Sequence, residues 1–249
     1  MHEFIHFNQR ILSAANARVS AVSSAALYGK GIFTTVAVYN SKPFLWEKHW
    51  QRLIENAQKI TIDFTAFTED IVRSSLFEII AENNLTNARA RITFFDESSS
   101  NVWQTNQKSK TSLLIQTADF RTVKNKLRLA VSPFRVNSTA PLVGVKSCNY
   151  LENILALEDA KARGFGEAIR LNDKGEVVSA CLANLFWKKG VGIFTPSPET
   201  GCLKGTTREF ILENFTVEER KAELIELEKA DEIFLTSAGI GIVSAVLDF

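Results

Sequence analysis

The chain has 249 residues, of which 45% are hydrophobic and 23% charged, and its formal net charge is +1. This length is enough for one large domain or two modest ones, each with a buried core. The near-neutral charge excludes any bulk electrostatic reason to expect nucleic acid or an anionic membrane surface as a partner.

The N-terminal stretch "MHEFIHFNQRIL" mixes charged and polar residues with apolar ones, which is not the pattern of a signal peptide. No apolar run is long enough to span a bilayer. The cysteines Cys148, Cys181 and Cys202 lack metal-type spacing, so they predict reduced thiols, a cytoplasmic protein and no metal. His2 and His6 have the i, i+4 spacing of a metal-binding pair, but a frayed, solvated terminus is the preferred interpretation.

The first half of the chain predicts two strands, two helices and two further strands. The segment "GIFTTVAVYNSKPFLW" is rich in β-branched and aromatic residues and predicts a hairpin with its turn at Asn40 and Ser41. Residues 47–60 carry apolar side chains at helical spacing, and 68–84 predict a second helix with Thr68 as its N-cap. Residues 88–97 and 111–120 predict strands of one sheet, and the polar stretch between them predicts a loop.

A second unit begins near residue 126. An irregular stretch leads to Lys146, and a helix is expected from about 149 to 163, ending at Gly164. Short strands are expected at 167–171, 176–179, 184–189, 191–195 and within 231–247, with helices after Gly205 and near 222–230. Antiparallel strands with helices packed outside predict an α+β protein. We expect a small N-terminal α/β subdomain, residues 1–118, and a larger cofactor-binding subdomain, residues 119–249.

Two turns of small residues are candidate phosphate sites. Gly205, Thr206 and Thr207 offer free backbone N–H groups and two hydroxyls at a helix start. Many helices begin in this way, so an ordinary helix start remains the alternative. The stretch "LTSAGIG" (235–241) follows a strand and offers further donors, with simple turn chemistry as its alternative.

Two cations are candidates for chemistry. Arg52 lies in the first amphipathic helix, and its planar fork of donors suits a phosphate. A snorkelling surface arginine is the alternative. Lys146 stands at the end of the mostly apolar part of "VGVKSCNYLENILA", where a solvated surface lysine is the alternative.

Taken together, these segments resemble the class IV aminotransferases, the fold-type IV pyridoxal-phosphate enzymes. The shared segments are "YGKGIFTT", His49 to Leu53, "KSCNYLENILA", and the series "NLF", Thr195 and "GTTR". The resemblance extends from about residue 28 to residue 245. It implies a D-amino-acid aminotransferase-like fold with a cofactor cleft between two subdomains, and a homodimer.

The resemblance also implies roles for individual residues. Lys146 would form a Schiff base with pyridoxal 5'-phosphate and later move the α-proton of the substrate. The amine must be neutral for both tasks, so its pKa should be lowered. The residues implied to hold the cofactor are Arg52, Thr206 and Thr207 at the 5'-phosphate, Ser237 and Ala238 through their backbone groups, and Tyr150, one helical turn beyond Lys146, at the 3'-oxygen.

The family's pattern is broken at Ser179. Relatives carry a glutamate there that pairs with the cofactor's pyridine nitrogen. Glu176 is a poor substitute, because an odd offset along a strand points to the other face. One interpretation is a degenerate relative with weak catalysis. The other is that Ser179 donates to an unprotonated nitrogen, which disfavours transamination but permits elimination.

The substrate's carboxylate lacks an obvious partner. Related enzymes carry an arginine at the position that aligns with Asp96 here. Arg89 and Arg91 lie on one face of the same strand and could take over the role. The alternative is that both are exposed charges on an edge strand.

The resemblance favours an aminodeoxychorismate lyase-like enzyme of folate biosynthesis, which releases pyruvate and 4-aminobenzoate. The segment "LANLFWKKG" is similar to that branch, whereas "KSCNYLENILA" is similar to the amino-acid aminotransferase branches. The alternatives are a branched-chain or D-amino-acid aminotransferase and a catalytically silent homologue. In either enzyme the partner would be a small-molecule amino substrate.

Overall fold

The computed structural model describes residues 1–99, 110–123 and 125–248, so most of the loop expected between residues 98 and 110 lies outside the described residues. The chain forms two units, which are described separately. The first unit comprises residues 1–120 and 145–149, and the second comprises residues 121–144 and 150 onward. The short segment 145–149, which carries Lys146, therefore belongs to the first unit, although the sequence interval 119–249 was expected to form one subdomain.

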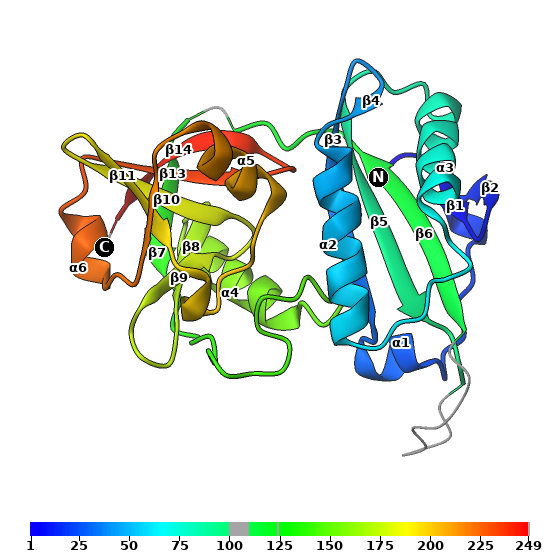
Figure 1. Ribbon diagram of the computed structural model, residues 1–249, viewed down its shortest axis with the longest axis horizontal. Coiled ribbons are helices and arrows are strands. Elements are labelled where there is room, and N and C mark those ends of the chain that lie inside the picture. The colour runs from blue at the N-terminus through cyan, green and yellow to red at the C-terminus, as the bar shows by residue number, and fades with distance from the viewer. Residues whose placement is uncertain (100–109, 124, 249) are drawn as a thin grey trace. The chain divides into compact units, whose positions relative to one another are not determined.

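The first unit contains a six-stranded sheet in the order β2-β1-β6-β5-β3-β4, in which all neighbouring strands are antiparallel (Figure 1). The predicted hairpin and the two predicted later strands are confirmed. The strands are β1 (Phe4–Phe7), β2 (Arg10–Ser13), β3 (Gly31–Tyr39), β4 (Lys42–Pro43), β5 (Ala88–Asp96) and β6 (Thr111–Ala118).

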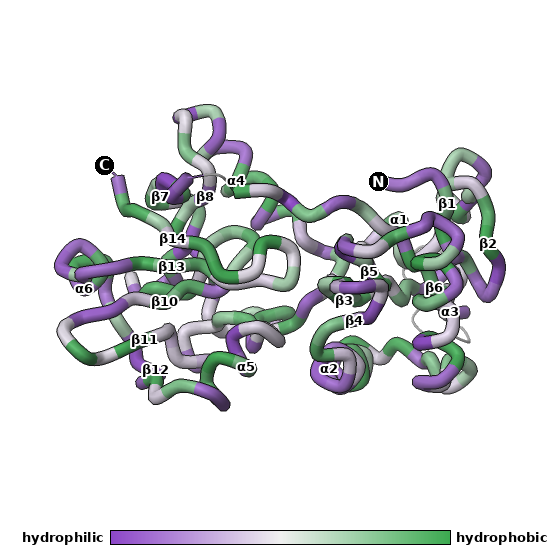
Figure 2. The backbone as a smooth tube through the Cα atoms, turned by 90° about the horizontal axis from the view of Figure 1, so that it is seen from above, coloured by the Kyte–Doolittle hydropathy of each residue, from purple (hydrophilic) through white to green (hydrophobic). Residues whose placement is uncertain are grey.

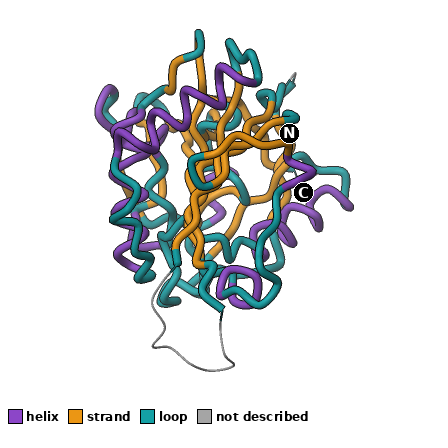
Figure 3. Tube along the Cα trace, turned by 90° about the vertical axis from the view of Figure 1, so that its right-hand side faces the viewer, coloured by secondary structure: helices purple, strands orange, loops and turns teal. Residues whose placement is uncertain are grey.

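Two long helices, α2 (Trp46–Lys59) and α3 (Glu69–Glu82), pack against this sheet (Figure 3). Leu53 and Ala57 of α2 are buried with Leu76 of α3 in a common core, because both helices are apolar on one face. The alternating colours of α2 in Figure 2 reflect this amphipathic sequence. Thr68 caps α3 as expected, since its side chain accepts a hydrogen bond from the backbone N–H of Ile71. The remaining helices are α1 (Ser24–Tyr28) and the short 3-10 turn Ala14–Asn16.

The N-terminus is an ordered part of the sheet, so the expectation of a frayed terminus is wrong. His6 lies in β1, opposite Ile11 of β2 and Ile115 of β6, and its side chain is buried. Its Nε2 lies 3.5 Å from a carboxylate oxygen of Glu78. Strand β1 is held by pairing with β2 on one side and β6 on the other. The mixed polarity of the segment gave no sign of this pairing. Among the described residues, no cluster of histidine, cysteine or acidic side chains could hold a metal ion.

The second unit contains an eight-stranded sheet in the order β12-β11-β10-β13-β14-β7-β8-β9. The expectation of antiparallel strands is only partly correct, because β7 pairs in parallel with both β14 and β8, and β11 pairs in parallel with β12. The strands are β7 (Leu127–Val131), β8 (Glu167–Leu171), β9 (Val177–Ala180), β10 (Asn184–Lys189), β11 (Gly192–Pro196), β12 (Glu218–Arg220), β13 (Glu232–Ser237) and β14 (Gly241–Leu247).

The helices of the second unit are α4 (Leu151–Ala162), α5 (Thr206–Asn214), α6 (Leu224–Glu228) and the 3-10 turn Pro198–Thr200. Helix α4 begins two residues later than expected, with Tyr150 as its N-cap, and Gly164 follows its end with a φ of 83°. Two sheets with packed helices confirm the α+β class. None of the helices in the described part of the chain has the length and apolar character that a bilayer crossing requires. All three cysteines are free thiols.

Candidate active site

The backbone around Lys146 is joined to the first strand of the hairpin. The N–H of Phe33 donates to the carbonyl of Lys146 at 2.9 Å, and the N–H of Cys148 donates to the carbonyl of Gly31 at 2.7 Å. Gly31 permits this approach, because a Cβ at that position would lie 2.9 Å from the Cys148 sulfur. These bonds place residues 145–149 in the first unit and fix the backbone from which the lysine side chain extends.

The amine of Lys146 has the environment of a nucleophile. Its Nζ lies 4.5 Å from the centre of the Phe33 ring. Desolvation, and then the charges of Arg52 and Arg91, hold the pKa of the Lys146 amine well below its ordinary value. A lysine with a lowered pKa is neutral at a pH where a surface lysine is charged, and only the neutral amine can attack a carbonyl group. The environment agrees with the predicted role of Lys146.

Arg52 is held on the face of α2 by a network that includes a histidine. Its guanidinium donates to the Thr34 hydroxyl oxygen, and that oxygen lies 2.6 Å from Nδ1 of His49. Burial, followed by the charges of Arg52 and Lys146, keeps the pKa of His49 well below its ordinary value. At Nδ1 a neutral His49 can accept a hydrogen bond from the Thr34 hydroxyl. The lone pairs of that hydroxyl oxygen can then accept the hydrogen bond from Arg52. The sequence prediction included neither Thr34 nor His49 in the site, although the i, i+3 spacing of His49 and Arg52 was a usable signal.

Arg91 is not an edge-strand charge. It lies on β5, which pairs with β3 on one side and β6 on the other. Its guanidinium carbon lies 3.6 Å from the centre of the Phe33 ring, the same ring that Lys146 approaches. The edge-strand interpretation of Arg91 is therefore wrong, and its role toward the substrate's carboxylate stays a prediction.

Asp96 has a structural role. Its carboxylate accepts from the Ser98 backbone N–H at 2.9 Å and forms an ion pair with Lys30 at 2.9 Å. Burial alone would raise the pKa of Asp96, but the hydrogen bonds from Ser98 and the charge of Lys30 lower it. An ionised carboxylate that is already paired would repel a substrate's carboxylate rather than bind it.

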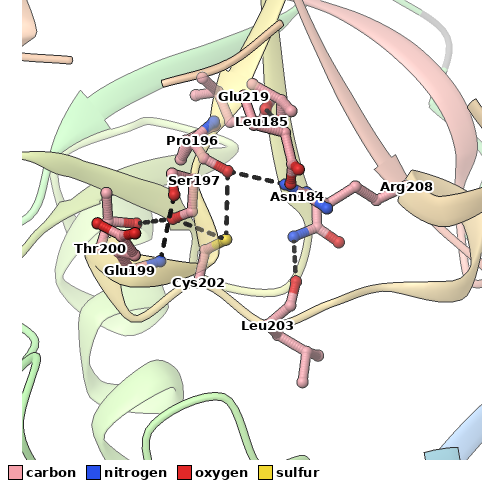
Figure 4. Close-up of polar contacts among 11 residues, drawn as sticks. Asn184, Leu185, Pro196, Ser197, Glu199, Thr200, Cys202, Leu203, Arg208 and Glu219 are labelled. Atoms are coloured by element: carbon pink, nitrogen blue, oxygen red, sulfur yellow. Dashed lines mark hydrogen bonds and ion pairs between the residues drawn. The ribbon is translucent and has the colours of Figure 1, made fainter. Parts of the chain in front are cut away.

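In the second unit, the backbone at the start of helix α5 lies very close to the side chain of Asn184. Gly205 is the N-cap, and as a glycine it has no side chain with which to cap the helix. A Cβ on Gly205 would lie only 2.0 Å from Oδ1 of Asn184, whose Nδ2 donates to the Leu203 carbonyl at 2.7 Å. The asparagine of "NLF" therefore fixes the loop that leads into α5 (Figure 4). The N–H groups of Thr206 and Thr207 lie at the positive end of the helix, where an anion is stabilised.

Two other residues of the motif series position this helix rather than a ligand. Arg208 is buried, donates to the Pro196 carbonyl at 2.9 Å and forms an ion pair with Glu219 (Figure 4). The Thr195 hydroxyl donates to the Leu185 carbonyl at 2.8 Å. Their side chains thus tie α5 and β11 to the neighbouring strands.

The hairpin between β13 and β14 contributes an unsatisfied hydroxyl. Thr236 stands opposite Asn184 across the β10–β13 ladder, so both side chains lie on one face of the sheet. The Thr236 hydroxyl is buried and has no hydrogen-bond partner among the described residues. Ser237 ends β13, and its hydroxyl accepts from the Gly239 backbone N–H at 3.3 Å, with Ala238 between them in the turn.

Tyr150 occupies a different local setting from that expected, whereas Ser179 lies on a strand as expected. Tyr150 is the N-cap of α4, so it does not lie one helical turn beyond Lys146, because residues 145–149 are not helical. Ser179 lies in β9, directly opposite Arg170 of β8. Glu176 precedes β9, and its carboxylate accepts from Asn172 Nδ2 at 2.7 Å. Glu176 is therefore engaged elsewhere and does not substitute for an acid at position 179.

Each unit carries one group of residues that could bind part of a cofactor. In the first unit, a lysine with a lowered pKa and a neighbouring arginine suit a carbonyl group and an anion. In the second unit, the N-terminus of α5 suits a phosphate. Pyridoxal phosphate carries both a carbonyl group and a phosphate. The residues present therefore fit that cofactor.

Comparisons with known proteins give the family. The family model described as amino-transferase class IV matches residues 31–246, and the chain belongs to this family of pyridoxal-phosphate-dependent enzymes. An aminodeoxychorismate lyase of Bacillus subtilis is 29% identical over 248 residues, covering 96% of this chain and 84% of the relative. A D-alanine aminotransferase of Listeria innocua is 28% identical over 254 residues, covering 94% and 84%.

The fold agrees with this family. The crystal structure of a branched-chain aminotransferase from Thermoproteus uzoniensis with norvaline superposes with a TM-score of 0.92 at 25% identity. The match covers 100% of this chain and 88% of the other. The predicted fold-type IV architecture is confirmed.

Proposed function

We propose that this enzyme is an aminodeoxychorismate lyase, which eliminates pyruvate from its substrate and leaves 4-aminobenzoate. The observation that carries the proposal is the serine at position 179. An acid beside the pyridine nitrogen is what amino transfer needs most, and here β9 presents a hydroxyl instead. The lyase reaction gains an aromatic ring, so it depends less on electron withdrawal by the cofactor. The likeness to the Bacillus subtilis lyase supports the same choice.

The two groups of site residues are proposed to serve one cofactor. Arg52 and the first turn of α5, with Thr206 and Thr207, would bind the phosphate, with Ser237 and Ala238 completing the contacts. Tyr150 would donate to the ring oxygen and Ser179 to the ring nitrogen. Pyridoxal phosphate, when bound, supplies the electron sink that lets bonds at the substrate's α-carbon break.

The chain's own residues perform the remaining tasks. Lys146 would bind the cofactor covalently through its neutral amine and would then hold or move a proton at Nζ, which its lowered pKa permits. The network of Arg52, Thr34 and His49 keeps the phosphate-binding guanidinium in one orientation. Arg91 is the proposed partner of the substrate's carboxylate, because guanidinium groups bind carboxylates through two parallel donors.

One observation favours a second candidate function. Arg91 lies beside Lys146 on the Phe33 ring, where it would suit the carboxylate of a simple amino acid as well as that of aminodeoxychorismate. Amino transfer from a branched-chain or D-amino acid is therefore the alternative. A catalytically weak homologue is the third outcome that Ser179 permits.

We further propose that the enzyme is a homodimer. Leu151, Ile154 and Leu155 form an apolar stripe along α4, and all three are exposed in the single chain. Exposed apolar side chains at i, i+3 and i+4 are typical of a helix that packs against a partner. Sedimentation at two protein concentrations would test this: a dimer in wild type and a monomer in Leu155→Glu is expected, and a wild-type monomer would contradict it.

The function is tested by supplying aminodeoxychorismate to the purified enzyme and measuring pyruvate. Pyruvate release without amino transfer to 2-oxoglutarate or pyruvate from any amino donor is the expected result. Amino transfer without pyruvate release from aminodeoxychorismate would favour the aminotransferase. Borohydride reduction followed by peptide mapping should fix the cofactor to Lys146, and a protein that takes up no pyridoxal phosphate would contradict the family's chemistry in this chain.

A further inference from the structure

A buried arginine shares a face with Ser179. Arg170 of β8 and Ser179 of β9 are directly paired in antiparallel strands, so their side chains point to the same side of the sheet. In such a pair the Cβ atoms are about 5 Å apart. Ala168, two residues before Arg170 on β8, packs against residues of α4 in a small apolar cluster, and Arg170 itself bonds Glu152 and Asn153 of α4. Arg170 and Ser179 therefore lie on the side of the sheet that α4 covers.

The acceptors that hold Arg170 are neutral. Its side chain is 1% exposed, and it donates to the carbonyl oxygens of Phe134 at 3.3 Å and Glu152 at 3.4 Å, and to Oδ1 of Asn153 at 2.9 Å. Two carbonyls and an amide fix the direction of the guanidinium without neutralising its charge. A positive charge is therefore held in place with little compensation.

The ionisable groups near Arg170 do not neutralise its positive charge. Within the described residues, its ion pair is with the Glu152 carboxylate at 3.9 Å, and that carboxylate is 81% exposed, so water screens the pair. Burial and the nearby Glu167 raise the pKa of Cys181 to about 12, which keeps the thiol neutral. Burial also raises the pKa of Glu167, which lies three residues from Arg170 along β8.

From this arrangement we infer that Arg170 places a fixed positive charge near the ring nitrogen of the cofactor. The inference rests on the proposed function, because it takes Ser179 as the residue beside that nitrogen. A neighbouring cation disfavours protonation of a basic nitrogen. Arg170 thus acts through space on the nitrogen that Ser179 contacts, and the pair selects elimination over amino transfer.

The test uses the protein loaded with pyridoxal phosphate that carries ¹⁵N in the ring. The ¹⁵N chemical shift distinguishes a protonated from an unprotonated ring nitrogen, and it can be followed against pH without any turnover. The wild-type nitrogen is expected to be unprotonated at neutral pH. Arg170→Met should raise its apparent pKa by about one unit or more, a tenfold change in protonation equilibrium. Arg170→Lys keeps the charge and should restore the wild-type titration.

Arg163→Met is the matched control, since it removes a cation of the same unit that bonds the Val131 carbonyl and Asp159. It should leave the nitrogen's titration unchanged. A wild-type nitrogen that stays protonated at neutral pH would overturn the inference, and so would an Arg170→Met protein with a wild-type titration.

Arg170→Gln serves if Arg170→Met does not fold, because its amide can still donate a hydrogen bond to the acceptors that hold Arg170. It removes the charge, so the nitrogen's pKa should rise, and an unchanged titration would overturn the inference. The cofactor assignment has its own readout. A protein that takes up no pyridoxal phosphate refutes both proposals, whereas uptake at Lys146 with a protonated nitrogen refutes only the role of Arg170.

Discussion

The hydroxyl oxygen of Thr34 lies 2.6 Å from Nδ1 of His49 and also accepts a hydrogen bond from Arg52. One small side chain on a strand therefore joins a neutral imidazole to the guanidinium that we assign to the phosphate. The orientation of Arg52 depends on that hydroxyl.

Thr34→Val should test this dependence, because valine keeps the shape and removes the hydroxyl. We expect the affinity for pyridoxal phosphate to fall about tenfold, the equivalent of one lost charge-assisted hydrogen bond. Equilibrium dialysis of the apoprotein measures the change. Thr117→Val is the control, since Thr117 is also buried in this sheet and bonds Asn83 and His2 instead. Equal losses in the two variants would refute the role of Thr34.

The lowered pKa of Lys146 predicts how cofactor uptake depends on pH. The neutral amine is the reactive form, so the uptake rate should rise with pH and reach its plateau well below the pH of an ordinary lysine. Arg91→Met removes a neighbouring positive charge, so it should raise the pKa of the amine and move the rate profile to higher pH. The development of visible absorbance after mixing gives the rate. A profile that does not move in Arg91→Met would show that Arg91 does not act on Lys146.

His49 predicts a loss of stability in acid. Its pKa in the folded protein lies well below 6.5, so the unfolded chain binds a proton below that pH when the folded one does not. Stability should therefore fall as pH drops below 6.5, with a slope from this group of up to about 1.4 kcal/mol per pH unit. Urea unfolding of the apoprotein at several pH values measures it. His49→Gln should flatten the slope, whereas His6, whose pKa is also lowered by burial, should continue to contribute.

Gly205 and Asn184 should be energetically coupled. Gly205→Ala forces a Cβ against Oδ1 of Asn184, and we expect it to cost about 1–3 kcal/mol of unfolding free energy and to weaken phosphate binding. In an Asn184→Ala background the obstacle is gone, so the same glycine substitution should cost less. A double-mutant cycle from urea unfolding gives the coupling energy. Additive effects would mean that the asparagine moves aside freely.

The sequence predicted the elements with clear periodicity. Helix α3 and its cap at Thr68, the hairpin turn at Asn40, and the strands β5 and β6 all followed from local patterns. The N-terminal strands were not predicted, because β1 and β2 are short and depend on pairing with each other and with β6 rather than on their own composition. The parallel pairs of the second sheet were missed for the same reason, since strand order is not a local property.

The candidate site residues Lys146, Arg52 and the Gly205 turn came from sequence motifs, and their roles stay predictions. The structure adds that the Lys146 amine has a lowered pKa and that Gly205 begins helix α5. Arg170 could not be singled out, because an arginine in "EAIRL" has meaning only once β8 is paired with β9. The roles of Arg208 and Asp96 also needed the structure, since only their contacts reveal that they hold other elements in place.

Residues 145–149 belong to the first unit but follow part of the second unit along the chain, which affects the order in which the polypeptide can fold. A fragment that ends at Phe120 would contain all six strands of the first sheet but not the lysine. In it, Gly31 to Phe33 would keep their pairing with β5 but lack their contacts with residues 146–148. During synthesis the first sheet can form early, whereas its last segment emerges only after residues 121–144 of the other unit. Contacts between Ile32 and Ser147 therefore close a long loop, and such contacts form slowly. We expect capacity for cofactor binding to appear late in refolding, after most of the secondary structure has formed.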